Sequence, residues 1–257
     1  MQYPKAFTDA LQFMWGEGFL SPGGPQEVRE MLAGEDLRGK TVLDIGSGLG
    51  GVDVLLAREH GAAEVVGIDV EPQLIAEARA LALAEGLEDM LRFDIVEPGP
   101  LPYAEHSFDA AFSKDAMVHI PDKAALFAEV MRVLKPGGVF VAADWLWREN
   151  AAESPSVKAW MAAVPLTFAF TTLAEAERAL HAAGFEAISL RDCRAALQAS
   201  NRREMEALDG PLRHKLAAIV GEEMAMSRLV SAKGRQGALD AGDLIPVHFT
   251  ARKPRAA

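Results

Sequence analysis

Asp115 and His119 are the two residues in this sequence whose types and spacing point most directly to chemistry. They stand four residues apart in the segment SKDAMVHIPDK, residues 113–123, so in a helix they would share one face. An aspartate attracts an ammonium group, and a histidine with a pKa near neutrality can remove its proton. The pair therefore predicts a site that delivers a neutral amine. The alternative is structural: His119 packs or caps this segment, and Asp115 pairs with Lys114 or Lys123.

A glycine-rich turn supplies the second chemical signal. The aliphatic residues 41–45 break abruptly into a run that contains Gly46, Ser47, Gly48 and Gly50. An amphipathic stretch follows, which indicates a strand, a tight turn and a helix. Glycine permits positive φ and lets a ligand approach the backbone. Asp69 ends the next apolar run, where an acid can accept two hydrogen bonds from a ribose, so the turn predicts a nucleoside-containing cofactor.

Three further features bear on which cofactor this is, because the same glycines also satisfy the dinucleotide pattern GxGxxG. Asp44 precedes the turn, where it would repel a pyrophosphate and favour a cofactor that carries positive charge. Asp94 ends a third apolar run, where an acid can hold the exocyclic amine of adenine. LKPGG, residues 134–138, stands between an expected helix and a later strand.

As a set, these features resemble the class I S-adenosylmethionine methyltransferases over roughly residues 40–144. The resemblance implies that S-adenosylmethionine is the cofactor, with Asp69 at its ribose, Asp94 and Ile95 at its adenine, and Asp44 near its methionine ammonium. The plainer alternative is that Asp69 and Asp94 are turn residues at strand ends. The residues expected to contact the cofactor are Asp44, Gly46, Ser47, Gly48, Gly50, Asp69, Val70, Asp94, Ile95 and Ser113.

The order of apolar runs predicts the elements that must position these residues. Strands alternate with helices, which indicates an α/β fold with a Rossmann-like, doubly wound, seven-stranded and mostly parallel sheet. The expected strands cover residues 41–45, 64–68, 91–93, 110–113, 139–143, 187–190 and 247–251. The expected helices cover residues 25–33, 51–60, 72–85, 123–134 and 173–183. Ligands bind beyond the carboxyl ends of the strands in such sheets, so the residues named above should meet there.

The chain is expected to form a single domain, residues 1–257, with two additions to the sheet. Residues 1–24 precede the first strand and are expected to close over the ligands as a lid that excludes water. Residues 145–170 and 193–243 interrupt the alternation of strands and helices. We expect them to form a helical cap over the carboxyl edge of the sheet.

The N-terminal segment carries a more specific resemblance. The residues Gln2-Tyr3, Gly16-Glu17, Leu20-Ser21 and Gly23-Gly24, with LDIGSGLGG and SKDAMVHI, resemble the phosphoethanolamine N-methyltransferases. Sarcosine and dimethylglycine methyltransferases share the loop pattern. The resemblance implies Tyr3 and His119 as a latch and base and Asp115 as the ligand of the substrate amine. The further substrate contacts expected are Gln2, Leu20, Ser21, Trp145 and Phe168.

The sequence departs from that family where a substrate phosphate would be held. Trp145 stands where a tyrosine is expected. The family's arginine and tyrosine match the stretch Leu166-Thr167-Phe168, and its lysine matches a position near Ser227-Arg228-Leu229; both stretches are mainly apolar. A phosphate without a cationic partner is costly to desolvate. The residues that could replace the missing cation are Arg228, Lys233 and Arg235, whose placement the sequence does not determine.

Four aromatic residues of the predicted cap allow two interpretations. They either form a wall for a methylated ammonium group or belong to the core of the cap. These residues are Trp145, Trp147, Phe168 and Phe170.

Composition limits the possible functions. The chain of 257 residues has 26 basic and 37 acidic residues, a net charge of −11, which disfavours nucleic-acid substrates. A single cysteine, Cys193, excludes an intramolecular disulfide and a cysteine-based metal cluster, and no metal site is expected. No apolar run of ~18 residues and no signal-peptide pattern is present, so we expect a cytoplasmic monomer or homodimer without membrane insertion.

These observations predict an S-adenosylmethionine-dependent N-methyltransferase that acts on a small polar amine, either phosphoethanolamine-like or glycine- or sarcosine-like. The nearest alternative is an O- or S-methyltransferase of a small secondary metabolite, in which the same base takes a hydroxyl or thiol proton. A nicotinamide oxidoreductase would share the glycine turn. A non-catalytic cofactor-binding protein that regulates a partner is the third class.

Overall fold

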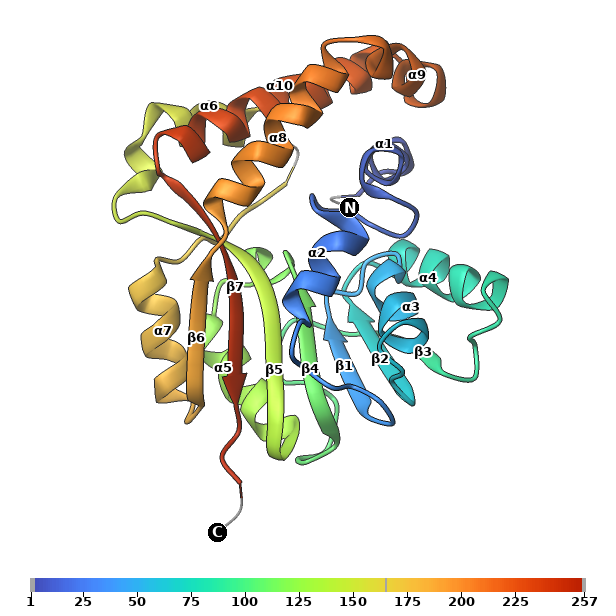
Figure 1. Cartoon of the computed structure of the whole chain (residues 1–257), viewed down its shortest axis with the longest axis vertical. Helices are drawn as coiled ribbons and strands as arrows, with labels where there is room; N and C mark the ends of the chain where they lie inside the picture. The colour runs from blue at the N-terminus through green and yellow to red at the C-terminus, as the bar shows by residue number, and fades with distance from the viewer. Residues whose placement is uncertain (1–2, 165, 256–257) are drawn as a thin grey trace.

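A seven-stranded mixed sheet forms the centre of the molecule (Figure 1). The computed structural model describes residues 3–164 and 166–255. The strand order is β3-β2-β1-β4-β5-β7-β6. In the described sheet β7 alone runs opposite to the other strands. The strands are β1 (Thr41–Ile45), β2 (Glu64–Asp69), β3 (Leu91–Ile95), β4 (Phe108–Lys114), β5 (Leu134–Trp147), β6 (Glu186–Asp192) and β7 (Leu244–Arg252). The predicted α/β sheet with seven strands is confirmed.

Helices cover both faces of the sheet, because strands such as β1 carry apolar side chains on both sides. Val42 packs into the layer that contains α2 (Gly24–Met31), α3 (Gly51–Arg58) and α4 (Pro72–Ala84). The next residue, Leu43, points the opposite way and packs in the layer that contains α5 (Lys123–Val133) and α7 (Leu173–Ala182). This alternation produces the doubly wound arrangement.

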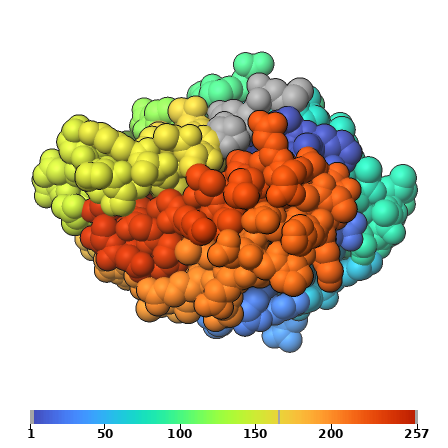
Figure 2. All heavy atoms as spheres, turned by 90° about the horizontal axis from the view of Figure 1, so that it is seen from above, coloured from blue at the N-terminus to red at the C-terminus, as the bar shows by residue number. Residues whose placement is uncertain are grey.

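A second group of helices lies over the carboxyl ends of the strands (Figure 1). These helices are α1 (Lys5–Trp15), α6 (Pro155–Ala162), α8 (Arg194–Leu208), α9 (Pro211–Val220) and α10 (Glu222–Asp240). Apolar residues from α1, α8, α9 and α10 share one buried cluster, so the N-terminal helix packs against the C-terminal ones. Seen from above, α8 to α10 spread in orange and red across much of this face (Figure 2). None of the described helices is long and apolar enough to cross a membrane.

The segment after β4 is not the α-helix that would place Asp115 and His119 on one face. Strand pairing with β5 continues through Lys114, and the Asp115 amide still donates to the Ala143 carbonyl at 2.8 Å. Asp115 then adopts a left-handed φ of 54°, and only a short 3₁₀ turn, Met117–His119, follows. Pro121 lies two residues further on and opposes a longer helix, because proline lacks an N–H and disfavours the α region before it.

The N-terminal segment is fastened to the glycine turn by a close backbone approach. The Gly51 amide, at the start of α3, donates to the Gly18 carbonyl at 3.2 Å. Gly18 has φ +79°, and a Cβ there would lie 2.6 Å from the Gly51 Cα. Only glycine avoids both the strain and the clash. The loop that follows α1 is therefore held directly against the predicted cofactor turn.

Gly18→Ala should loosen the N-terminal segment without unfolding the sheet. The left-handed φ and the clash with Gly51 together should weaken docking of residues 3–24 by ~2–4 kcal/mol. Limited proteolysis within the first 24 residues, followed beside the thermal midpoint, measures this loss. Gly39→Ala is the matched control, since Gly39 has φ +69° but nothing within 4 Å of an added Cβ. Equal proteolysis of the two variants would contradict the docking contact.

Candidate active site

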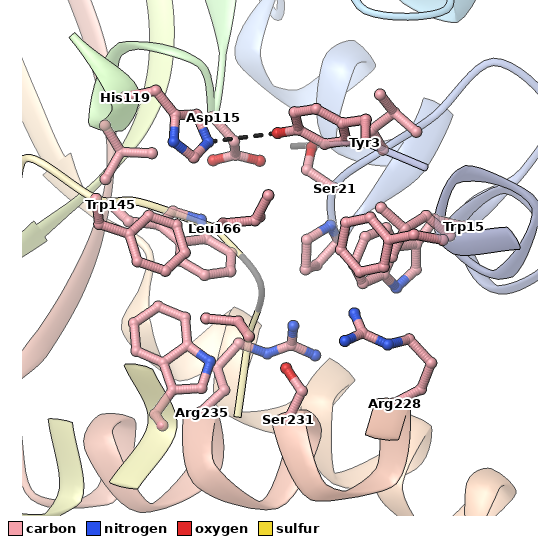
Figure 3. Close-up of a pocket in the computed structure, with 18 residues that line it drawn as sticks. Tyr3, Trp15, Ser21, Asp115, His119, Trp145, Leu166, Arg228, Ser231 and Arg235 are labelled. Atoms are coloured by element: carbon pink, nitrogen blue, oxygen red, sulfur yellow. Dashed lines mark hydrogen bonds between the residues drawn. The ribbon is translucent and has the colours of Figure 1, made fainter. Parts of the chain in front are cut away.

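A pocket lies at the carboxyl edge of the sheet, between the β4 end, the N-terminal segment and the cap (Figure 3). Tyr3, Asp115 and His119 lie on one side of it, and Arg228, Ser231 and Arg235 of α10 lie on the opposite side. The structure thus brings together the three residues that the sequence predicts as catalytic. Apolar and aromatic side chains line much of the remaining wall, including Phe7, Leu11, Trp15, Val118, Trp160, Val164 and Leu166.

Hydrogen bonds at both ring nitrogens fix the tautomer of His119. Nδ1 lies 2.7 Å from the Thr167 carbonyl, which can only accept, so Nδ1 carries the proton. In the neutral ring Nε2 is then the acceptor, and the Tyr3 hydroxyl donates to it at 3.4 Å. Burial lowers the pKa of His119 below its usual value, although the Thr167 contact opposes the shift. His119 is therefore a neutral base at neutral pH, with its lone pair toward Tyr3.

Asp115 is held by a buried ammonium group. Lys114 Nζ lies 2.7 Å from the Asp115 carboxylate and 2.8 Å from that of Glu27 in α2. It also donates to the Ser21 hydroxyl at 2.8 Å and to the Pro22 carbonyl at 2.7 Å. The structural alternative for Asp115, an ion pair with Lys114, is thus present. It coexists with the position of Asp115 in the pocket, since the carboxylate contacts Lys114 and lines the cavity.

The glycine turn between β1 and α3 can accept a ligand against its backbone. Gly46, Gly48 and Gly50 all have positive φ, at 79°, 55° and 85°. A Cβ on Gly46 would lie 2.2 Å from that of Ala116, and one on Gly48 would lie 3.2 Å from Leu20 Cδ1. Beneath the turn, the Ser47 hydroxyl is buried without a hydrogen-bond partner among the described residues. An uncovered backbone with an unpaired hydroxyl below it suits a polar ligand.

Asp69 and Asp94 lie at the carboxyl ends of the neighbouring strands, as the sheet order requires. The Asp69 carboxylate accepts from the amides of Gly48 and Glu71, each at 3.0 Å, so it shapes the glycine turn as well as facing the edge. Asp94 accepts from the Tyr103 hydroxyl at 2.8 Å and lines a second, shallow depression. The next residue on each strand, Val70 and Ile95, is 52% and 51% exposed, which suits a flat apolar surface for an adenine ring.

Two other predicted cofactor residues have buried side chains. Ser113 is fully buried, and its hydroxyl donates to the Ile45 carbonyl at 2.8 Å, so it joins β4 to β1. Asp44 projects into the layer below α3, where its carboxyl group faces that of Asp53. Burial raises the pKa of both carboxyl groups, that of Asp53 to about 7. The charges of Asp53 and Asp69 raise the pKa of Asp44 further.

The predicted substrate residues divide between the pocket and its surroundings. Leu20, Ser21, Trp145 and Phe168 line the pocket, while Gln2 lies outside the described residues. Phe168 stacks on the His119 ring, with centroids 5.4 Å apart. The other two aromatic candidates, Trp147 and Phe170, stack on each other in the buried cluster of the cap and are absent from the pocket wall.

Two of the three basic residues that could replace the missing cation, Arg228 and Arg235, line the pocket opposite His119. Arg228, Ser231 and Arg235 lie three and four residues apart, so they share one face of α10, and that face lines the pocket. Lys233 lies off this face, is half-exposed and pairs with Asp209. The helical spacing of the two arginines is visible in the sequence. What the sequence lacks is any signal that this face of the cap turns toward the site.

Comparisons with known proteins show which family the chain resembles. Residues 36–209 match the family described as "Methyltransferase domain". Phosphoethanolamine N-methyltransferase 3 of Arabidopsis thaliana is 36% identical over 146 residues, which is 56% of this chain and 29% of that protein. The chain therefore spans about a third of the length of such curated relatives.

Two solved structures share the fold over nearly the whole chain. Phosphoethanolamine N-methyltransferase 2 of Haemonchus contortus, in complex with phosphomonomethylethanolamine and S-adenosylhomocysteine, superposes with a TM-score of 0.91 and 24% identity. The match covers 99% of this chain and 59% of that one. A putative sarcosine dimethylglycine methyltransferase from Galdieria sulphuraria gives a TM-score of 0.80 at 19% identity, covering 98% of both chains.

Asp53→Asn should reduce the dependence of stability on pH. The folded chain holds a proton on Asp53 up to about pH 7, whereas the unfolded chain releases it near 3.8. Stability from this group is complete below the lower value and is lost as the pH rises toward the upper one. The amide cannot ionise, so the stability of the variant relative to that of the wild type should rise by ~2–3 kcal/mol between pH 5 and pH 8. Urea unfolding at both pH values measures this, with exposed Asp89→Asn as control.

Proposed function

We propose that this chain, which belongs to the methyltransferase domain family, transfers a methyl group from S-adenosylmethionine to the nitrogen of a small polar amine. One observation carries the proposal. His119 donates from Nδ1 to the Thr167 carbonyl, so its unprotonated Nε2 faces Tyr3 inside the pocket, on the side where Asp115 lies. A neutral base beside a carboxylate is what a protonated amine needs before it can act as a nucleophile.

The residues around the glycine turn would hold the cofactor, which supplies an electrophilic methyl group on a sulfonium when it is bound. Gly46, Gly48 and Gly50 leave the backbone uncovered, and Asp69 stands where it can accept from ribose hydroxyls. Asp94 and Ile95 would contact the adenine, and the turn that contains Ser47 would lie at the methionine end, with the Asp44 carboxyl group buried beneath it.

Tyr3 and His119 can together take one proton from the amine. As the amine passes a proton to the Tyr3 oxygen, the hydroxyl proton already directed at His119 moves to Nε2. The amine and the tyrosine are then neutral, and the histidine is an imidazolium whose Nδ1–H still donates to Thr167. Burial and the nearby carboxylates raise the pKa of Tyr3, so its hydroxyl remains protonated before and after the exchange.

Asp115 would attract the ammonium form of the substrate into the pocket. The proposed substrate class is phosphoethanolamine-like or glycine- or sarcosine-like, which the names of the similar proteins support. Ordering of the N-terminal segment over the site would exclude water, since Tyr3 reaches His119 from that segment. An O- or S-methyltransferase would keep the same base but would have no use for a carboxylate beside it.

His119→Ala should lower kcat by ~10²–10⁴-fold, because the amine would keep its proton. Affinity for S-adenosylhomocysteine should stay within about twofold, since the cofactor residues lie around the glycine turn. The assay is mass-shift detection of methylated products from a panel of amines, phenols and thiols. His181→Ala, at an exposed position in α7, is the matched control and should keep full activity.

Two outcomes of the same assay would count against this function. Turnover of His119→Ala at the wild-type rate would make the histidine structural. Methylation confined to phenols or thiols, with no dependence on Asp115, would move the reaction from nitrogen to oxygen or sulfur. For an amine substrate, Asp115→Ala should raise KM more than it lowers kcat, because it removes ground-state attraction.

Asp69→Ala should weaken binding of S-adenosylhomocysteine by ~10–100-fold, through loss of charge-assisted hydrogen bonds to the ribose. The same carboxylate accepts from the Gly48 and Glu71 amides, so the turn itself should also loosen. Asp69→Asn separates the two effects, since one amide oxygen can still accept from the turn. Calorimetry on both variants tests this; unchanged affinity in Asp69→Ala would remove Asp69 from the cofactor site.

A further inference from the structure

We infer that the α10 side of the pocket is a receptor for one negative charge, with Arg228 as its binding residue, so that the methylated amine carries a singly charged oxyanion such as a carboxylate. This inference rests on the proposed function, which places the amine beside Asp115 and His119. It assigns the opposite wall of the pocket to the anionic end of the substrate, and it excludes a dianionic phosphate monoester as the preferred substrate.

Arg228 is a buried cation without an acidic partner. Its side chain is 4% exposed, and no carboxylate in the described part of the chain lies within 4.0 Å of it. Its Nε has no hydrogen-bond partner there, and the one hydrogen bond of its side chain within the described residues runs from Nη2 to the Ser227 hydroxyl at 3.4 Å. Burial, reinforced by Arg235, lowers its pKa to about 10, so the group is still charged at neutral pH. Buried charges in folded proteins are normally paired.

The neighbouring aromatic ring does not satisfy this cation. The Arg228 guanidinium lies 4.5 Å from the centre of the Phe7 ring, a cation–π contact. Such a contact stabilises the charge but accepts none of the five N–H groups in the way that an oxygen does. Arg228 therefore retains donors that point into the cavity it lines (Figure 3).

A second unpaired donor lines the same pocket. The Trp160 side chain is 1% exposed, and its Nε1–H has no acceptor among the described residues. The neighbouring Trp145 and Phe168 rings pack against it with centroids 5.3 Å away in each case, so its apolar surface is well covered. An oxyanion held by Arg228 would supply the acceptors that the Arg228 and Trp160 donors lack.

Arg235 differs from Arg228 because it is already neutralised. Its Nη2 lies 2.8 Å from the Glu204 carboxylate, and its Nε donates to the Asn201 side chain at 2.6 Å. Glu204 also accepts from the Trp15 indole at 3.2 Å, which fixes it in place. Two guanidinium charges and one carboxylate leave this wall with a net charge of +1.

The single surplus charge sets the charge of the ligand. A monoanion neutralises the wall, whereas a phosphate monoester, which is largely dianionic above pH 6, would leave one negative charge among aromatic side chains. Loss of solvation at such a site is compensated only by a matching countercharge. Arg228 is therefore the residue that binds the anion, and Glu204 limits the net charge of the wall to +1.

Four amines with the same two-carbon spacer test this wall. They are β-alanine with a carboxylate, 2-aminoethanesulfonate with a sulfonate, phosphoethanolamine with a phosphate, and ethanolamine with no charge. At pH 8 we expect both monoanions to exceed ethanolamine and phosphoethanolamine in kcat/KM by at least about tenfold. Longer ω-aminocarboxylates and their amino alcohols, compared in pairs, extend the series should the pocket need a longer spacer.

Arg228→Met should remove the preference for the monoanion, lowering kcat/KM for the carboxylate by ~30–100-fold while changing that for ethanolamine less than threefold. Glu204→Gln should raise the charge of the wall to +2 and shift the preference toward phosphoethanolamine. Lys233→Gln is the matched control, since it removes a cation of α10 that lies outside the pocket. Trp160→Phe should give a smaller loss, about three- to tenfold, because it removes one neutral donor.

Binding and stability measurements separate this inference from the proposed function. If no amine is methylated, the proposed function fails, and calorimetry of the same four compounds with the S-adenosylhomocysteine complex decides the inference alone. Tighter binding of the carboxylate to wild type than to Arg228→Met supports it. Equal binding overturns it, as does a wild-type preference for phosphoethanolamine that survives in Arg228→Met. A fall in thermal midpoint in Arg228→Met without any change in selectivity would make the residue structural.

Discussion

The buried ion cluster around Lys114 is the contact on which the arrangement of the site depends. Its ammonium, at the end of β4, binds Asp115 beside the pocket, Glu27 on α2, and Ser21 and Pro22 of the N-terminal segment. Burial alone would raise the pKa of Glu27, but Lys114 and His248 outweigh it and lower it to about 2. One buried cation therefore holds the end of β4, α2 and the N-terminal segment together. Removing it would leave the buried Asp115 carboxylate without a cation and Glu27 with His248 alone.

This cluster also explains how Asp115 can line the pocket at a left-handed φ of 54°. The strain of such a backbone, of order 1–3 kcal/mol, persists only where surrounding contacts fix it. Here the Asp115 amide donates to β5 and its carboxylate contacts Lys114. The carboxylate is thus positioned before any ligand arrives. A site that is ordered in advance loses less entropy when the amine binds.

The sequence predicts the sheet, and the place of the glycine turn and the strand-end acids at its edge, because these features depend on local patterns. Apolar runs locate the strands, and a glycine turn or a strand-end acid has one place to lie once the sheet is formed. The backbone after β4 and the packing of the cap depend instead on contacts between distant parts of the chain. Asp115 and His119 meet through a strand extension and a 3₁₀ turn, which depend on pairing with β5. Arg228 reaches the pocket only because α10 packs against α1, more than 200 residues away in the chain.

Unsatisfied buried groups mark the two ends of the ligand space with opposite chemistry. Under the glycine turn the Ser47 hydroxyl is unpaired, and the Asp44 and Asp53 carboxyl groups have only each other, whereas at the α10 wall the unpaired atoms are N–H donors of Trp160 and Arg228. Each such group lowers the stability of the empty protein, since a buried polar atom without a partner costs ~1–3 kcal/mol. Ligands of complementary charge would recover that free energy on binding. The buried groups that lower the free energy of unfolding are thus the groups that would bind a ligand. Whether such a group is a donor or an acceptor predicts which end of the ligand lies there.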